Sequence, residues 1–284
     1  MIIGLETEYA EFKKYFEDES LKYFTTQTKV NPQLGLLWKS MQYTFFLDGK
    51  RFRPFLCFLS GKTFKASFNQ IFPFALAVEL IHTYSLIHDD LPCLDNDDIR
   101  RGQPTNHKVF GEDIALLAGD ALLTEAFSVI SHISADPKTL IKIIQLLAQK
   151  IGPQGMVGGQ VLDMKVNEKI KLSDLEQIHL LKTANLIEAA VVGAALLSGV
   201  DEAEILKLSN FAMNLGIAFQ IKDDLLDGSD SDQNYKNYIQ VLGHERTQQE
   251  LKAKTQMAID CLKKISISTS ELNAILQYNI NRLK

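Results

Sequence analysis

The chain has 284 residues, 46% hydrophobic and 23% charged, with a formal net charge of −5. This charge argues against a nucleic-acid-binding protein, because it supplies no basic field for phosphate backbones or anionic membranes. Three scattered cysteines without metal-ligand spacing are typical of reduced thiols, so we expect a cytoplasmic protein. No signal peptide is evident, and no run reaches the roughly 18 apolar residues of a membrane helix, so we expect no membrane span.

Apolar side chains recur with helical spacing along nearly the whole chain, and the alternation typical of strands is almost absent. Prolines at tolerated first positions and capping residues mark several helix starts. We expect helices over residues 7–26, 32–46, from 54, 72–91, 111–133, 137–150, 173–198, 202–227, 236–264 and 269–283. A glycine group at 152–159 should interrupt the helices before Gln160, and Ser173 with Glu176 should form a capping box. The pattern predicts an all-α bundle of about ten helices, with residues 1–284 forming a single domain.

Carboxylates are crowded between Asp89 and Asp98, directly after the strongly apolar segment 74–87. Such crowding needs cationic compensation, because like charges close together on a helix destabilise it. Carboxylate oxygens suit Mg²⁺. Arg100 and Arg101 follow at once, and a guanidinium group matches phosphate geometry.

A second acidic segment contains Asp223, Asp224 and Asp227. A helix places Asp223 and Asp227 on one face, because they are spaced i, i+4. Asp89 and Asp95 are six residues apart, and a proline between them should interrupt the helix. We expect this insertion to bring Asp95 back toward the face of Asp89. Together the two segments predict a site for Mg²⁺ and diphosphate.

The acidic segments have two other interpretations. Taken alone, either segment is better explained as a solvated helix end, but two such segments, each after an apolar helical run, favour a metal site. A calcium loop starting at Asp230 fails, because Tyr235 stands where glycine is needed and Val241 where the closing glutamate belongs.

Basic residues complete the predicted site. Lys50, Arg51 and Arg53 lie at a junction between a loop and a helix, where backbone N–H groups and positive charge favour phosphate. A lone basic turn is more often simply solvated, and a lone histidine in a helix is more often a core residue. Three further basic side chains lie within apolar helices, where an unpaired charge is costly: His82, Lys182 and Lys222.

In this order and spacing, these motifs resemble those of the trans-isoprenyl diphosphate synthases (polyprenyl synthetases), most of all the short bacterial farnesyl diphosphate synthases. The resemblance covers roughly residues 40–245. The matching segments are Gly49–Pro54, Asp89–Asp95 with its two-residue insertion, Arg100–Gly102, Gly158–Gln160 with Asp163, Lys182–Thr183 and Asp223–Asp227.

The resemblance implies an isoprenoid synthase fold around a central cavity, a homodimer and prenyl transfer to isopentenyl diphosphate. It implies about three Mg²⁺ ions held by carboxylates, at Asp89, Asp90, Asp95, Asp223, Asp224 and Asp227. The allylic diphosphate is then expected on Arg100, Lys182, Lys222 and Lys236. The diphosphate of isopentenyl diphosphate is expected on Lys50, Arg53, His82 and Arg101, with Thr183 and Gln220 lining the reacting end.

Product length is expected to depend on Tyr84 and Ser85, one turn before Asp89. A tyrosine there resembles the farnesyl-forming pattern and should block growth beyond fifteen carbons, although it could also be an ordinary core aromatic. The segment Asp89–Glu112 also resembles geranylgeranyl synthases of plants, so a twenty-carbon product is the alternative.

The chain departs from the family pattern after Asp227, where a longer loop usually ends in a glycine and a lysine. Here the loop is short, Lys236 takes the place of the closing lysine, and Tyr235 replaces the glycine. A non-catalytic subunit of a prenyl synthase is the alternative from another class, but such a subunit is expected to lose one of the motifs. A terpene cyclase has no need of the second diphosphate site.

Overall fold

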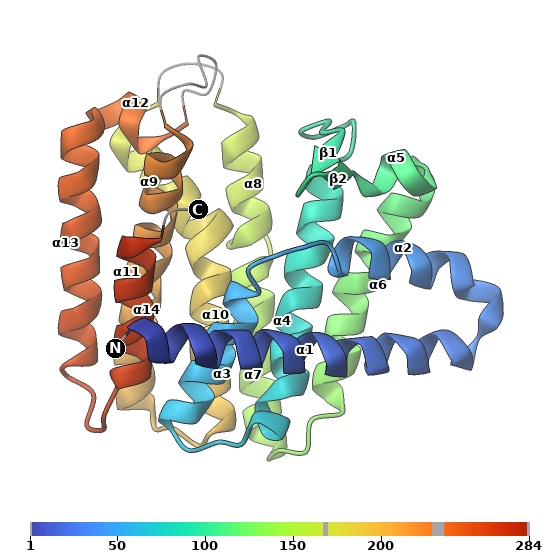
Figure 1. The fold of residues 1–284 in the computed structure, drawn as a ribbon, viewed down its shortest axis with the longest axis horizontal. Helices are drawn as coiled ribbons and strands as arrows, with labels where there is room; N and C mark the ends of the chain where they lie inside the picture. The colour runs from blue at the N-terminus through green and yellow to red at the C-terminus, as the bar shows by residue number, and fades with distance from the viewer. Residues whose placement is uncertain (1, 167–169, 229–235, 283–284) are drawn as a thin grey trace. The chain divides into compact units, whose positions relative to one another are not determined.

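The computed structural model describes residues 2–166, 170–228 and 236–282, and these are almost entirely helical (Figure 1). The all-α prediction is confirmed. In chain order the elements are α1 (Ile2–Val30), the 3₁₀ turn η1 (Pro32–Leu34), α2 (Gly35–Phe45), α3 (Phe52–Thr63), α4 (Phe68–Asp89), β1 (Ile99–Arg100), β2 (Gln103–Pro104), α5 (Asn106–Phe110), α6 (Glu112–Ser131), α7 (Pro137–Ile151), α8 (Met156–Met164), α9 (Leu172–His179), the π-helical segment η2 (Leu180–Ala184), α10 (Asn185–Leu197), α11 (Glu202–Asp227), α12 (Tyr238–Leu242), α13 (His244–Leu262) and α14 (Ser270–Asn281).

The chain divides into two compact units. The N-terminal unit comprises Thr7–Phe55 and Asn69–Ser134, and the C-terminal unit comprises Met1–Glu6, Leu56–Phe68 and Ala135–Lys284. The single domain expected over residues 1–284 stays a prediction.

Aromatic side chains build the core of the N-terminal unit. Phe16 and Phe24 on α1 are fully buried, because their helical spacing turns them to the same side. The ring of Phe24 lies 5.0 Å from Phe45 on α2, and the ring of Phe16 lies 5.9 Å from Phe72 on α4. Each such pair contributes about 0.5–1.5 kcal/mol beyond the burial of its area. These contacts fix α4, which carries the first acidic segment.

A two-residue hairpin follows the first acidic segment. β1 and β2 pair antiparallel, and the connecting residues Arg101 and Gly102 have φ angles of 52° and 76°. Positive φ at both central residues is the geometry of a tight hairpin turn that matches the natural twist of the strands. These strands could not be predicted from the sequence, because two residues are too few for an alternating pattern.

Small residues allow close helix packing in the C-terminal unit. An added Cβ at Gly216 on α11 would lie 2.5 Å from the Cβ of Ala184, and one at Gly159 on α8 would lie 2.4 Å from the backbone nitrogen of Lys182. The segment Leu180–Ala184 therefore packs tightly against α8 and α11. Within this unit α11 also runs beside α13 (Figure 1).

Helix bounds test the sequence expectations directly. The helix expected over 202–227 is found as α11, because Asp201 caps its start by accepting a hydrogen bond from the Glu204 N–H at 3.0 Å. The expected interruption before Gln160 is found but is shorter than the glycine group, since α7 ends at Ile151 and α8 runs from Met156 through Met164. The capping box expected at Ser173 is wrong, because the N-cap of α9 is Lys171 and no side chain caps it.

Three helical stretches of the described chain are long and apolar enough to cross a membrane, judged by length and composition alone: Phe68–Asp89, Glu112–Ser131 and Leu172–Leu197. In the first and third, 67% and 78% of the most apolar window is buried inside the protein, whereas in the second the value is 39%. The expected absence of a membrane span stays a prediction.

Candidate active site

The first acidic segment in the N-terminal unit starts where α4 ends, at Asp89. The Asp95 N–H donates to the Asp89 carbonyl at 2.9 Å, and the Asn96 N–H donates to the Leu91 carbonyl at 3.1 Å. The backbone of Asp95 therefore returns to Asp89, as expected from the insertion. Asp95 is exposed and Asp89 is half-buried, so both carboxylates are placed near the surface of this unit.

Asp90 differs from its neighbours, because its side chain is buried and bound by an arginine. Arg100 on β1 donates from Nε to Asp90 Oδ1 at 2.9 Å and from Nη2 to the same oxygen, and its Nη2 lies 3.4 Å from Asp97. Burial raises the pKa of Asp90, although the charge of Arg100 opposes this. Arg100 thus has a carboxylate partner in the absence of substrate.

A basic cluster of Arg53, His82 and Arg101 forms in the same unit. Arg53 Nη1 lies 3.3 Å from His82 Nε2, and an arginine can only donate, so this ring nitrogen accepts. The guanidinium of Arg101 lies over the backbone of Gly49, where an added Cβ would be 2.6 Å from its Nη1. Loss of hydration lowers the pKa of His82 well below its ordinary value, and the charges of Arg53 and Arg101 add to the effect. His82 is therefore neutral near pH 7.

Lys50 and Arg51 adjoin this cluster and differ in role. Lys50 is exposed, and its carbonyl accepts a hydrogen bond from the Tyr9 hydroxyl. Arg51 is buried at a φ of 44°, and its guanidinium binds Glu79 at 3.0 Å and Glu17 at 3.1 Å. Arg51 thus anchors the turn to α4 and α1, a function that sequence reasoning missed because Glu79 lies inside an apolar run.

In the C-terminal unit, two lysines of the predicted site meet at one carboxylate. Lys182 Nζ lies 2.8 Å from Asp163 Oδ2, and Lys236 Nζ lies 3.1 Å from Asp163 Oδ1. Burial alone would raise the pKa of Asp163, but the two lysines hold it below its ordinary value. We call Asp163, Lys182 and Lys236 the lysine–aspartate cluster. Tyr235 and the loop before it lie outside the described residues.

The π-helical segment η2 supplies Lys182 and Thr183. π-helical turns inside α-helices are rare and occur frequently at functional sites. Thr183 is buried at 8% exposure beside Ala184, whose small side chain permits the approach of α11. The sequence predicted an unbroken helix here, because the insertion of one residue into a turn leaves no compositional mark.

The second acidic segment ends α11, and each of two carboxylates has a different partner. Asp223 Oδ1 lies 2.6 Å from Nη1 of Arg282, whose guanidinium also stacks on the ring of Phe219 with its carbon 4.2 Å from the centroid. Sequence reasoning missed Arg282, because 58 residues of chain separate it from Asp223 and no motif marks it. Asp227 is exposed at the end of α11.

Asp224 is buried and accepts a backbone hydrogen bond. Its Oδ2 receives the Tyr238 N–H at 2.7 Å and lies 4.0 Å from Nε2 of His179, whose ring stacks on Tyr238. Burial raises the pKa of Asp224 to about 7, the Tyr238 N–H opposes this, and the charges of Asp223 and Asp227 add to it. Burial also lowers the pKa of His179 to about 4. Asp224 thus fixes α12 to α11.

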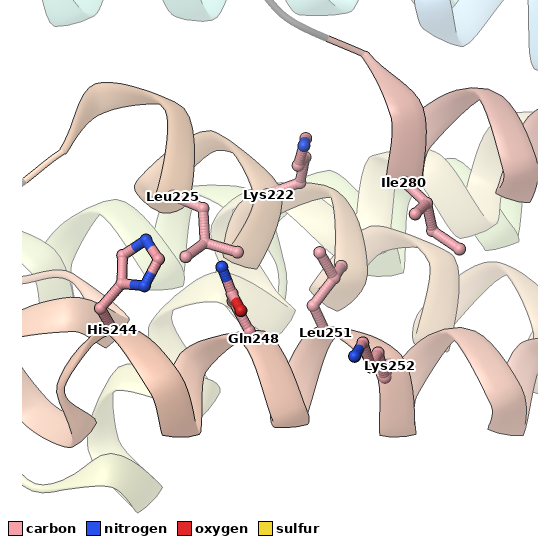
Figure 2. A pocket seen from close by; sticks show the side chains of 7 residues that line it. All are labelled: Lys222, Leu225, His244, Gln248, Leu251, Lys252 and Ile280. Atoms are coloured by element: carbon pink, nitrogen blue, oxygen red, sulfur yellow. The ribbon is translucent and has the colours of Figure 1, made fainter.

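Lys222 does not join the lysine–aspartate cluster. It lines a cavity of about 280 Å³ with Leu225 on α11, residues of α13 and Ile280 on α14. Figure 2 shows Lys222 and Ile280 on one side of this cavity and His244, Gln248, Leu251 and Lys252 on the other. Gln220, also predicted for the site, is half-buried on α11.

The predicted chain-length residues lie on α4. Tyr84 is buried at 5% exposure, and its ring lies 5.7 Å from that of His88 in an edge-on arrangement. Burial and the charge of Asp89 raise the pKa of Tyr84 to about 12, so its hydroxyl is uncharged near neutral pH. The Ser85 hydroxyl donates to the His82 carbonyl at 2.9 Å and is thereby turned to its own helix.

The donor chemistry of both acidic segments suits Mg²⁺, which prefers carboxylate oxygens and keeps several waters. Within the described ranges no three acidic, histidine or cysteine side chains converge into a ready-made metal cage. Cations already neutralise part of each segment, at Asp90 through Arg100 and at Asp223 through Arg282. Paired carboxylates of this kind can accept a divalent cation without a buried cage, so the residues of both acidic segments fit Mg²⁺.

Comparison with known proteins places the chain in a family. The polyprenyl synthetase family profile matches residues 35–240. The chain is 40% identical over 269 residues to the farnesyl diphosphate synthase of Micrococcus luteus, covering 90% of this chain and 92% of that protein. It is also 47% identical over 199 residues to a chloroplastic geranylgeranyl pyrophosphate synthase of Catharanthus roseus, covering 69% of this chain and 56% of that protein.

A solved structure agrees with these matches. The geranyltransferase of Legionella pneumophila superposes with a TM-score of 0.90 at 28% identity, covering 99% of this chain and 98% of that one. The fold is that of the isoprenyl synthases. The chain belongs to the polyprenyl synthetase family.

Proposed function

We propose that the protein is a Mg²⁺-dependent prenyltransferase that condenses isopentenyl diphosphate with dimethylallyl or geranyl diphosphate to give farnesyl diphosphate. The observation that carries this proposal is the presence of two basic clusters. One contains Arg53, His82 and Arg101, and the other is the lysine–aspartate cluster. One transferred prenyl group needs one diphosphate site, whereas condensation of two diphosphates needs two. The similarity to the Micrococcus luteus farnesyl diphosphate synthase over most of both chains supports the same activity.

The basic cluster binds the diphosphate of isopentenyl diphosphate in this proposal. Arg53 and Arg101 supply positive charge, and the exposed Lys50 adds a further positive charge. His82 is neutral because of its low pKa, so it contributes a hydrogen bond rather than a third positive charge. The site thereby matches an anion without placing three repelling cations together.

The carboxylates Asp89, Asp95 and Asp223 would hold Mg²⁺ ions, about three in all by the family resemblance, with Asp90, Asp224 and Asp227 in support. When bound, Mg²⁺ neutralises charge on the departing diphosphate of the allylic substrate. Lys182 and Lys236 would exchange Asp163 for this diphosphate. By the family resemblance, Arg100 and Lys222 would also contribute positive charge to its binding. Stabilisation of a developing anion by fixed cations is the largest catalytic contribution of this kind of site.

The remaining residues shape the reaction at carbon. Thr183 and Gln220 direct oxygen atoms at the allylic cation, which the double bond of isopentenyl diphosphate attacks to form the new carbon–carbon bond. The resulting cation loses a proton to the released diphosphate. The apolar surroundings exclude water, which would otherwise capture the cation.

Substitution of Arg53 tests the assignment of the two diphosphates. Arg53→Gln should raise KM for isopentenyl diphosphate at least tenfold, because a hydrogen bond to a charged group contributes about 1.5–3 kcal/mol. KM for geranyl diphosphate should change little. Equal increases in both KM values would contradict separate sites, and Lys108→Gln, outside the predicted site, is the matched control.

Substitution of Tyr84 tests product length. Tyr84→Ala removes a buried ring, so the products should lengthen from fifteen to twenty carbons or more, whereas Tyr84→Phe should leave them unchanged. Chromatography of the dephosphorylated products gives the answer. A twenty-carbon product from the unchanged protein would instead favour the geranylgeranyl alternative, which the Catharanthus roseus relative supports.

We further propose that the protein is a cytoplasmic homodimer without a membrane span. α6 supports the dimer, because its apolar window is only 39% buried and it exposes Leu116 and Leu117 at 47% and 52%. An exposed apolar helix face of this kind is typical of an interaction surface. Leu116→Glu with Leu117→Glu should halve the mass measured by light scattering.

A further inference from the structure

Arg51 stands two residues before Arg53 of the basic cluster, but its own side chain is only 1% exposed. Each of the three nitrogens of its guanidinium group has an acceptor within the protein. These acceptors are Glu79 at 3.0 Å from Nη1, Glu17 at 3.1 Å from Nε and the Leu47 carbonyl at 3.4 Å from Nη2. A guanidinium that is buried and bound in this way does not reach a substrate, so Arg51 is not itself a ligand of the diphosphate.

The backbone of Arg51 is strained, and its carbonyl starts α3. Its φ of 44° lies in the left-handed region, which residues other than glycine seldom adopt and which persists only where surrounding contacts hold it. The Arg51 carbonyl accepts the Phe55 N–H at 3.0 Å, the hydrogen bond that opens the ladder of α3. Arg53 lies in the first turn of that helix. The contacts of the Arg51 side chain therefore determine where α3 starts and where Arg53 is placed.

The ion pair of Arg51 is made to the same helix that carries His82. Glu79 and His82 are spaced i, i+3 on α4, so their side chains are neighbours on one face. Arg51 binds Glu79 at this face. Arg53 Nη1 lies 3.3 Å from His82 Nε2 at the adjacent position. The start of α3 is thus joined to α4 at two neighbouring points, of which only the second belongs to the proposed substrate site.

We propose that Arg51 is a positioning residue, whose buried ion pair with Glu79 holds Arg53 in place to bind the diphosphate of isopentenyl diphosphate. This inference rests on the function proposed for the basic cluster. Cations that are already in place need no rearrangement when the anion arrives, and a displacement of about 1 Å can cost as much as a hundredfold in rate. Glu79 also offsets the charge of Arg51. Burial lowers the pKa of Arg101, and the Glu79 carboxylate opposes this effect.

A purely stabilising role for Arg51 makes a different prediction. Arg51→Met leaves the Glu79 carboxylate buried without its cation, which should lower Tm by roughly 5–10 °C. Adding Glu79→Leu removes the stranded charge, and replacing a buried ion pair by apolar side chains is often neutral or stabilising. This double variant should regain the Tm of the unchanged protein to within about 3 °C. If Arg51 only stabilises the fold, the double variant also regains normal kinetics.

The experiment measures Tm together with kcat and with KM for each of the two diphosphates. Arg51→Met with Glu79→Leu should regain Tm but keep KM for isopentenyl diphosphate raised about tenfold, because α3 is no longer joined to α4 beside His82. KM for geranyl diphosphate and kcat should change less than about threefold. Lys150→Met is the matched control, because it leaves the buried Glu188, 2.5 Å away, without its cation in the C-terminal unit. It should lower Tm and leave KM for isopentenyl diphosphate unchanged.

Arg51→Lys gives a second reading if the double variant does not fold. Lysine keeps the charge beside Glu79, so Tm should stay near that of the unchanged protein. An ammonium group is a point charge and does not reproduce the planar fork that binds three acceptors in fixed directions. KM for isopentenyl diphosphate should therefore still rise about threefold or more.

A double-mutant cycle with Arg53→Gln tests whether Arg51 acts through Arg53. Residues that act through one interaction have effects that do not add, whereas independent residues have effects that do. Adding Arg51→Met and Glu79→Leu to Arg53→Gln should therefore raise KM for isopentenyl diphosphate by less than about threefold further. Full addition, about tenfold further, would show that Arg51 acts independently of Arg53 and would overturn the proposal.

Three other results would contradict the positioning role in different ways. A variant with recovered Tm and normal KM for isopentenyl diphosphate would overturn the role of Arg51 and leave the proposed function intact. Equal rises in KM for both diphosphates would show a general loss of structure and would also overturn it. Absence of any product from the unchanged protein would overturn the proposed function and this inference with it.

Discussion

The two acidic segments share a carboxylate-rich composition but neutralise their buried carboxylates by different means. In the first, Asp90 is bound by the guanidinium of Arg100, and in the second, Asp224 accepts the backbone N–H of Tyr238. Both groups are buried, and burial raises both pKa values, yet only that of Asp224 reaches about 7. A full positive charge keeps a buried carboxylate ionised more effectively than a single peptide dipole does.

The carboxylates nearer the surface also differ between the two segments in whether an arginine binds them. Asp95 and Asp227 face solvent, whereas Asp223 is bound by Arg282. The arginine of the first segment binds the buried Asp90, and the exposed Asp95 is the carboxylate that we propose for Mg²⁺. The arginine of the second segment binds Asp223, so the Mg²⁺ ion that we propose there would have to share or replace that partner.

The largest effect is expected from removing the arginine of the first segment. Arg100→Gln leaves Asp90 buried without its cation, and breaking such a pair costs about 3–5 kcal/mol. The partial exposure of Arg100 and protonation of Asp90 should reduce this to roughly 2–3 kcal/mol. Urea unfolding measures the loss, and adding Asp90→Asn should recover much of it. An Arg100→Gln variant as stable as the unchanged protein would contradict the pairing.

The second largest effect is expected in the pH dependence of the free energy of unfolding, through Asp224. Because its pKa is raised in the folded state to about 7, its stabilising contribution is present below about pH 4 and is lost as the pH rises through 7. Asp224→Asn should remove this loss, so the variant should gain on the order of 1–3 kcal/mol relative to the unchanged protein between pH 4 and pH 8.

Unfolding in urea at several pH values, with a chelator present, checks this expectation. Asp90→Asn should change the pH dependence of stability less over the same pH range, because Arg100 helps to keep the Asp90 carboxylate ionised. If the difference in stability between Asp224→Asn and the unchanged protein is constant with pH, the raised pKa of Asp224 is contradicted.

The smallest effect is expected at Arg282. Arg282→Gln should cost about 1–2 kcal/mol, because the arginine loses its ion pair with Asp223 and its contact with the Phe219 ring. Mg²⁺ should then raise Tm more in this variant than in the unchanged protein, since the cation replaces the lost guanidinium. The exposed Arg246→Gln is the control. Equal Mg²⁺ responses in all three proteins would argue against competition at Asp223.

Two local features were predicted correctly, although the capping box at Ser173 was not. α11 was predicted with its observed bounds, because Asp201 caps its start and Gly228, at a φ of 72°, ends it. The turn that returns Asp95 to Asp89 was predicted from the proline insertion. Both features depend on a few neighbouring residues.

Features that depend on distant contacts could not be predicted. Arg51 and Arg53 are two residues apart, yet only the fold shows that the first meets Glu79 while the second reaches His82. The π-helical turn at Lys182 depends on packing of η2 against other helices. Arg282 reaches Asp223 only when α14 lies beside α11. In each case tertiary packing decides between roles that the residue type alone leaves open.

The most direct test of the central claim is the product formed from isopentenyl diphosphate and geranyl diphosphate with Mg²⁺. We expect farnesyl diphosphate, identified as a fifteen-carbon alcohol after removal of the diphosphate, and no product when the metal is chelated. A folded protein that binds both diphosphates and forms no carbon–carbon bond would contradict the account and favour a non-catalytic subunit.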